Sequence, residues 1–234
     1  MKKLVSLFLI TSCVSLFAQD IKLQQDVTEN KISTEGPNRK NYHHSYMGYG
    51  VCAGKASDSL KTKFGSGNFV FGYRYKRRFC QAYAIGYDVN YNANFFRIVQ
   101  DSMKMFPNNV LHKKEKLIQN NVALVIYNRF NFGRRGDYIG HFLDLGAYAE
   151  WNFRSVYQTY DEYAVANSVG ASNTRQIHSG LTYLNPFNYG FTARIGASKY
   201  ALYANYRMSD IFKISYIFPE LPRLIIGLQL GLHK

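Results

Sequence analysis

Long apolar runs are scarce in this sequence of 234 residues. Outside the segment 4–17, no stretch reaches the roughly 18 consecutive apolar residues that a transmembrane helix needs. Any insertion into a membrane would therefore have to use β-strands. The chain also lacks a glycine-rich nucleotide loop, the cysteine and histidine spacing of a zinc site, and an acidic calcium-binding loop. We accordingly expect no cofactor and no metal.

Acidic residues and cysteines are also few. The chain has 15 Asp and Glu against 29 Lys and Arg, which gives a formal net charge of +14. A strongly basic protein usually suggests a nucleic-acid partner. The export signal and the strand pattern instead assign many of these charges to the turns and loops of an exported β-protein. We therefore expect no nucleic acid to bind. Of the 3 cysteines, only Cys52 and Cys80 lie outside the amino-terminal apolar segment.

The amino-terminal segment is typical of a secretory signal. Two lysines precede apolar residues up to Phe17, and Ala18 provides a small residue at the expected cleavage site. Lipidation at Cys13 is the alternative processing, which the apolar residues after it disfavour. The polar segment that follows the signal is either a spacer or a partner-binding arm. The expected segments are a signal peptide at 1–18, a periplasmic amino-terminal arm at 19–42 and an outer-membrane β-barrel domain at 43–234.

The clearest structural signal is the alternation of apolar and polar residues from Leu143 to Arg154. Successive side chains of a β-strand point to opposite faces, so this segment has one apolar and one polar face. A soluble strand averages about 5–6 residues, whereas a tilted strand needs about 9–11 to cross a bilayer. We therefore predict lipid on the apolar face and a closed lumen on the other. Seven further segments alternate in the same way: 46–54, 69–76, 83–92, 121–130, 189–196, 200–207 and 224–232.

The connections between these eight segments alternate in length. Short periplasmic turns and long extracellular loops are typical of outer-membrane barrels. The predicted fold is therefore all-β, an eight-stranded antiparallel up-and-down transmembrane β-barrel in the cell outer membrane, with both termini in the periplasm. A soluble β-sandwich is the alternative. The short turns are expected at 77–81, 133–137 and 197–199, and the long loops at 56–67, 97–116, 158–177 and 209–222.

This topology has consequences for the cysteines and the aromatic residues. Cys52 falls near the outer end of the first strand and Cys80 in the first periplasmic turn, a bilayer crossing apart, whereas a disulfide needs Cα atoms within about 7 Å, so both should be unpaired. Aromatic residues form 16% of the chain, mostly at the ends of apolar faces, where their rings favour the headgroup boundary. The expected girdle residues are Tyr73, Tyr75, Tyr91, Phe95, Trp151, Phe153 and Tyr206.

Charged residues of both signs lie on the predicted lumen face. An eight-stranded barrel is just wide enough for side chains to fill it, and buried charges must pair or bear a large desolvation cost. We therefore expect a structural ion network instead of a conducting path, although a gated pore is the alternative. The expected members are Arg74, Asp88, Arg129, Asp144, Glu150, Arg154, Arg194 and Arg207.

A basic cluster, residues 112–116, falls in the second long loop. Positive charges at a membrane surface attract anionic headgroups. We expect Lys113, Lys114 and Lys116 to contact an anion, with outer-membrane lipid and lipopolysaccharide as the leading candidates. A solvated basic loop without a specific ligand is the alternative.

A catalytic candidate is the sequence His43-His44-Ser45. It resembles the His-x-Ser arrangement of lipid A deacylase barrels, in which a histidine activates a serine nucleophile. These residues begin the first strand at the periplasmic side, whereas that chemistry works at the outer leaflet, and no acidic residue that would orient the histidine is identifiable. We therefore predict no catalytic residue, and a lipid A-modifying enzyme is kept as an alternative function.

Four motifs carry a family resemblance: 127–131 (YNRFN), 143–148 (LDLGAY), 206–212 (YRMSDIF) and 219–222 (PELP). Over about residues 46–232 the chain resembles the PorT-like outer-membrane β-barrel family. The resemblance implies a barrel without catalysis, and the family's namesake is associated with type IX protein secretion. The ending Leu232-His233-Lys234 departs from the terminal aromatic residue usual in such strands. The expected function is a non-enzymatic structural or interaction component of a cell-envelope assembly, with an envelope or secretion protein as partner, and a narrow outer-membrane pore is the main alternative.

Overall fold

The computed structural model describes residues 36–54, 60–132, 139–162, 170 and 172–233, and the structural statements below concern these residues. The expected signal peptide, most of the amino-terminal arm and the basic turn at 134–135 lie outside them. None of the described segments forms a helix long and apolar enough to cross a membrane.

The described residues form nine antiparallel β-strands. The alternating, β-branched and aromatic-rich segments supply the side chains that suit a pleated sheet with two different faces. The strands are β1 (Asn41–Ala53), β2 (Gly67–Arg78), β3 (Tyr83–Arg97), β4 (Lys114–Phe132), β5 (His141–Glu162), β6 (Asn173–Ser179), β7 (Phe187–Ala197), β8 (Tyr200–Arg207) and β9 (Leu224–Leu232).

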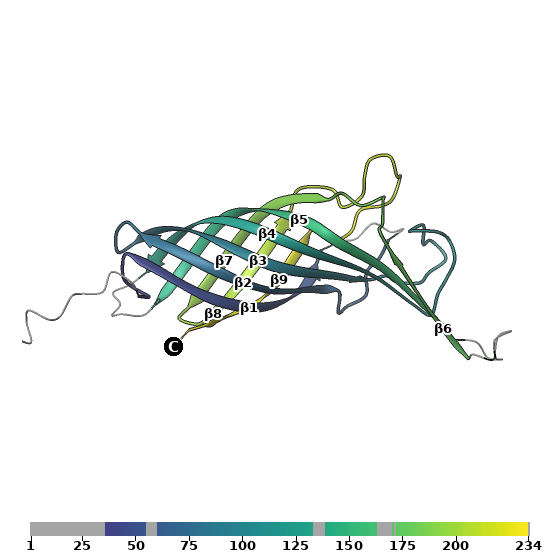
Figure 1. Ribbon diagram of the computed structural model, residues 1–234, viewed down its shortest axis with the longest axis horizontal. Helices are drawn as coiled ribbons and strands as arrows, with labels where there is room; N and C mark the ends of the chain where they lie inside the picture. The colour runs from purple at the N-terminus through teal and green to yellow at the C-terminus, as the bar shows by residue number, and fades with distance from the viewer. Residues whose placement is uncertain (1–35, 55–59, 133–138, 163–169, 171, 234) are drawn as a thin grey trace, which may run out of the picture. The chain divides into compact units, whose positions relative to one another are not determined.

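Eight of these strands close into a ring. Consecutive ring strands pair with each other, β5 pairs with β7, and β9 returns to β1. The ring of tilted strands is visible in Figure 1. The predicted all-β, antiparallel, up-and-down fold is confirmed. Strand β6 lies outside the ring, where it pairs only with the last seven residues of β5.

The long-loop end therefore differs from the sequence prediction. The sequence predicts a loop over 158–177, but β5 continues to Glu162 and β6 pairs antiparallel with it from Asn173, so residues 158–162 and 173–177 belong to the two strands of a β5–β6 hairpin beyond the ring. Strand β4 also begins earlier than expected, at Lys114. Polar residues dominate these extensions, and a hydrophobic alternation pattern has no signal there.

Burial alternates along the ring strands as the two-faced pattern requires. In β3 and β4 nearly every second residue is buried, and the residues between them are partly or fully exposed. Buried positions face the lumen and carry Asn, Arg, Asp and Tyr, whereas exposed positions carry large apolar residues. A soluble fold would place its apolar residues inside, so the arrangement is inverted.

One irregularity reverses the two faces of β5. Asn121 pairs with Asn152 and Asn120 pairs with Arg154, so Phe153 is an extra residue opposite them. Such a β-bulge shifts the alternation by one position. Arg154 is exposed as a result, and its predicted place in the lumen was wrong.

The ends of the ring are defined by their connections. At the short-turn end, residues 36–40 continue into β1, and the Pro37 carbonyl accepts a hydrogen bond of 2.5 Å from Lys76 Nζ. Cys80 lies exposed in the β2–β3 turn at this end, while Cys52 lies near the other end of β1. Both cysteines are unpaired, which confirms the prediction.

Candidate functional site

A chain of five charged side chains crosses the interior of the ring. Arg74 Nε lies 2.9 Å from Asp88 Oδ1, and Arg194 also pairs with Asp88. Arg194 Nε lies 3.2 Å from Asp144 Oδ2, and Arg129 Nε lies 2.6 Å from Asp144 Oδ1. All five side chains are almost completely buried. The structure thus brings together five of the eight residues predicted for the lumen network.

Strand register explains most of these contacts. Arg74 stands directly opposite Asp88, and Asp144 stands between Arg129 and Arg194 on its two neighbouring strands. The remaining contact, from Arg194 on β7 to Asp88 on β3, joins strands that are not neighbours and therefore spans the lumen. These five buried side chains, three guanidinium groups and two carboxylates, together carry one net positive charge.

Aromatic rings occupy the space around the guanidinium groups. The Tyr127 ring centroid lies 4.6 Å from Arg194 Cζ, and the Phe142 centroid lies 3.9 Å from Arg129 Cζ. The Tyr127 hydroxyl donates a 3.1 Å hydrogen bond to the Tyr75 carbonyl. Cation–π contacts of this kind are stronger where water is excluded. The centre of the ring is therefore filled by side chains that hold one another in place.

Two predicted lumen residues lie apart from this chain. Glu150 is buried and accepts a 3.1 Å hydrogen bond from Asn92 Nδ2. Arg207 donates instead to Glu220 Oε1 at 2.6 Å, on the β8–β9 loop. Both residues line a polar cavity of about 40 Å³, which has room for only a few water molecules.

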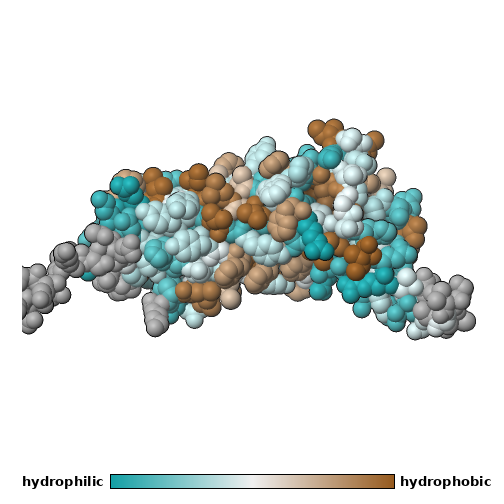
Figure 2. Space-filling view, in the orientation of Figure 1, coloured by the Kyte–Doolittle hydropathy of each residue, from teal (hydrophilic) through white to brown (hydrophobic). Residues whose placement is uncertain are grey.

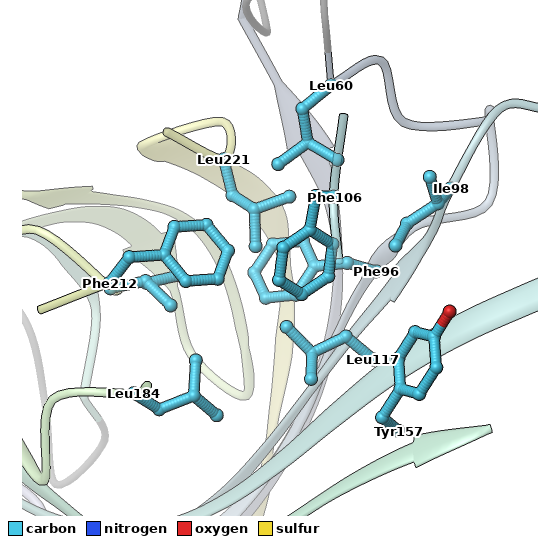
Figure 3. Close-up of a cluster of buried hydrophobic side chains, with 10 residues drawn as sticks. Leu60, Phe96, Ile98, Phe106, Leu117, Tyr157, Leu184, Phe212 and Leu221 are labelled. Atoms are coloured by element: carbon cyan, nitrogen blue, oxygen red, sulfur yellow. The ribbon is translucent and has the colours of Figure 1, made fainter. Parts of the chain in front are cut away.

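The long-loop end of the ring is closed by a hydrophobic cluster. Phe106, from the β3–β4 loop, is completely buried, and its ring centroid lies 4.8 Å from that of Phe212 in the β8–β9 loop. Figure 3 shows these rings pointing toward one another and toward side chains from the strands. The cluster consists of Leu60, Phe96, Ile98, Phe106, Leu117, Tyr157, Leu184, Ile211, Phe212 and Leu221.

A smaller cluster lies at the short-turn end. It contains Tyr42, Ile139, Phe142 and Ala201. The Tyr42 ring stacks on that of His44 at 5.1 Å. Side chains therefore fill the interior near both ends as well as at its centre.

Asp161 lies near the far end of the β5–β6 hairpin, where it stands opposite Thr174. This carboxylate lies 2.7 Å from His112 Nδ1 and accepts a 3.1 Å hydrogen bond from the Lys113 N–H. Burial alone would raise the pKa of Asp161, but the His112 and Lys113 hydrogen bonds outweigh it and lower the pKa below its ordinary value. The β3–β4 loop is thereby tied to the hairpin.

The three predicted anion-contacting lysines occupy different environments. Lys113 pairs with Glu162. Lys114 Nζ lies 5.3 Å from the Tyr160 ring centroid, and Lys116 Nζ lies 5.2 Å from the Phe95 centroid. Lys114 and Lys116 line a groove on the outer face that also contains Lys63, Arg97 and Arg175. Sequence reasoning missed these last three because strand pairing, and not sequence spacing, brings them together.

The histidine and serine of the catalytic candidate lie on the outer face of β1. Ser45 is partly exposed and stands opposite Tyr73, and the ring of His43 lies 5.6 Å from that of Tyr73. Both residues therefore point away from the lumen. Within the described part of the chain, no three His, Cys, Asp or Glu residues are grouped so that they could hold a metal ion.

No protein-family model matches the chain, and no curated protein matches it. The resemblance to PorT-like barrels accordingly stays a prediction from the sequence motifs.

Proposed function

We propose that this protein is a non-catalytic outer-membrane β-barrel that spans the membrane with its eight ring strands. The support is the belt of large apolar side chains on the outer face. On β4 this stripe runs from Val122 to Phe132, about 33 Å at a rise of about 3.3 Å per residue, and a tilt of 35–45° shortens it to about 25 Å, the height of the apolar band of membrane barrels. Around the whole ring, the exposed residues of the belt include Phe71, Val89, Leu124, Ile126, Trp151, Phe191 and Leu228.

The space-filling view agrees with this arrangement. Figure 2 shows hydrophobic side chains along the middle of one face and a more hydrophilic surface toward the end that carries β6. Tyrosines satisfy amide oxygens on the outer face: Tyr83 donates to Asn128 Oδ1, within the β4 stripe, at 2.7 Å, and Tyr91 donates to Asn120 Oδ1, just beyond the Val122 end of the stripe, at 2.6 Å. Amphipathic rings near the boundaries are typical of membrane barrels.

The barrel is proposed to be non-conducting. The observation that carries this conclusion is the closed interior, in which the arginine–aspartate chain fills the centre and the Phe106 cluster covers one mouth. A narrow pore is the competing function, favoured only by the small polar cavity beside Glu150.

Planar-bilayer recording separates the two functions. The full chain is expected to give no discrete conductance steps under conditions in which a porin control opens. Reproducible steps whose ion selectivity changes in Asp144→Asn would establish a pore and refute the filled-lumen proposal.

We also propose that the β5–β6 hairpin binds a protein of a cell-envelope assembly; the motif resemblance suggests a secretion-related one. Strand β6 pairs with β5 on one side only, and no other described strand covers its second edge. An edge strand presents unpaired N–H and C=O groups to which another chain can add a strand. The proposed interaction is therefore strand addition to β6.

Crosslinking in intact envelopes tests this role. A photoreactive residue at Gln176, on β6, is expected to give an adduct with one discrete protein, whereas the same probe at Ile214 should not. Ile214 is a suitable control because it is exposed like Gln176 but lies on the β8–β9 loop, outside any strand. Absence of an adduct at Gln176, or the same adducts at both positions, would contradict the proposal.

A further inference from the structure

Five basic side chains gather around one groove on the outer face of the long-loop end. Lys63 comes from the β1–β2 loop, Arg97 from the end of β3, Lys114 and Lys116 from the start of β4, and Arg175 from β6. The groove has a volume of about 580 Å³. Segments that are distant in the sequence thus contribute positive charge to one place.

Strand register places these charges side by side. Arg97 stands opposite Lys116, and Lys116 stands opposite Gln158. One step farther along, Lys114 and Arg175 stand on the two sides of Tyr160. Directly opposed residues have Cβ atoms about 4.5–5.5 Å apart, and like charges so placed are destabilising. The directly opposed Arg97 and Lys116 are therefore unfavourably placed unless an anion lies between their charges.

Nearby carboxylates do not neutralise the groove. Glu115 also lines the groove, but its buried carboxylate pairs with Lys104 at 2.5 Å, and Glu162 pairs with Lys113. Within the described segments, none of the five groove side chains forms an ion pair within 4.0 Å.

The unpaired positive charges of the groove affect the protonation of Lys116. Burial lowers the pKa of Lys116 below its ordinary value, and the positive charges of Arg97 and Arg175 lower it further.

Three of the five groove side chains have contacts that hold them in position before any ligand arrives. The Phe95 and Tyr160 rings support Lys116 and Lys114, as described above. Arg175 Nη2 donates a 2.8 Å hydrogen bond to Gln158 Oε1. Preorganised donors lose less conformational entropy on binding.

The position of the groove suggests its ligand. Phe95 and Ile118 lie two residues nearer the apolar belt than Arg97 and Lys116, so the basic side chains are placed just outside the hydrocarbon region. Phosphate groups of lipids lie at this level, and Arg and Lys bind phosphate through charge-assisted hydrogen bonds. We propose that this groove binds the phosphate groups of a phosphorylated lipid headgroup in the leaflet on the long-loop side; the choice of lipid rests on the membrane-spanning function proposed above.

Binding of purified full-length protein to bisphosphorylated lipid A in detergent micelles tests the proposal by native mass spectrometry. The double variant Lys116→Gln/Arg175→Gln is expected to weaken binding at least tenfold, and Lys116→Arg/Arg175→Lys should retain it. The matched control, Arg77→Gln/Lys199→Gln, removes the same charge from exposed positions at the short-turn end and should bind within twofold of wild type. Heat-dependent mobility on gels verifies that each variant is folded.

Three results would overturn the proposal. Unchanged binding in the groove variant would remove the site, and equal losses in both charge-removal variants would show only general electrostatic attraction. A third arm uses inorganic pyrophosphate: binding as tight as that of lipid A, with the same variant dependence, would make free phosphate the ligand. Micelle binding does not require the protein to span a bilayer, so these failures are distinguishable from failure of the membrane proposal.

Discussion

Replacement of Asp144 by asparagine is the sharpest test of the lumen chain. Asp144 accepts hydrogen bonds from Arg129 Nε at 2.6 Å and Nη2 at 2.8 Å, and it also pairs with Arg194 Nε at 3.2 Å. Its side chain is 0% exposed. In Asp144→Asn the chain would retain three guanidinium groups and one carboxylate, so its net charge would rise from one to two in a space without bulk water.

The expected cost follows from this burial. Removal of one partner from a buried ion pair costs about 3–5 kcal/mol, because the remaining charge is left uncompensated. Asp210→Asn is the matched control. Asp210 also pairs with an arginine, Arg223, but its side chain is 53% exposed, and such surface pairs contribute about 0–1 kcal/mol.

A second-site change separates charge imbalance from simple loss of contacts. In the double variant Arg129→Met/Asp144→Asn, the remaining buried Arg74, Arg194 and Asp88 carry one net positive charge, as the five side chains do in the wild type. We expect the double variant to recover about 2 kcal/mol relative to Asp144→Asn, within the range measured for coupled neighbours.

Urea unfolding of the protein in lipid vesicles, followed by Trp151 fluorescence, provides the free energies. If Asp144→Asn destabilises the protein by no more than Asp210→Asn does, the buried chain is not a structural network and the reasoning fails. A double variant less stable than Asp144→Asn would show that charge balance does not govern the interior.

Three further predictions use other parts of the molecule. Gly86→Ala should destabilise the barrel by at least about 1 kcal/mol, since a Cβ there would collide with the Tyr75 backbone carbonyl and the Tyr127 hydroxyl; wild-type stability in urea would contradict this close packing. Because folding lowers the pKa of Asp161, its stabilising contribution is complete above the unfolded pKa of about 3.9 and is lost as pH falls through the folded value. The protection of the Lys113 amide against hydrogen exchange, measured relative to the intrinsic exchange rate at each pH, should therefore fall in acid, and Asp161→Asn should abolish that pH response. Cys80 should react with a membrane-impermeant maleimide only after intact cells are permeabilised, and labelling before permeabilisation would reverse the proposed orientation.

Sequence patterns predict the ring well because the two faces of each strand follow from the alternation of neighbouring residues. Alternation assigns each strand residue to a face, and strand order then places Arg74 opposite Asp88 without any long-range information. The same logic gives the contacts of Asp144 with its two neighbouring strands.

The failures occur where alternation carries no information. The alternation of apolar and polar residues continues unbroken through Phe153, so the sequence gives no sign of the bulge there. The bulge places Arg154 on the outer face and not in the lumen. Polar residues of β6 resemble a loop until their pairing with β5 is known. The basic groove depends on register across several strands, which is why Arg97 and Arg175 could not be connected to Lys116 from spacing alone.

The membrane-spanning barrel is the central claim, and Trp151 tests it most directly. It is the single tryptophan of the chain, and it lies on the outer face of β5 with 52% of its surface exposed. In vesicles of brominated phospholipid its fluorescence should be strongly quenched, most by bromine near the headgroup side of the acyl chain, and aqueous iodide should have little effect. Efficient quenching by iodide without quenching by brominated lipid would place the outer face in water and contradict the account.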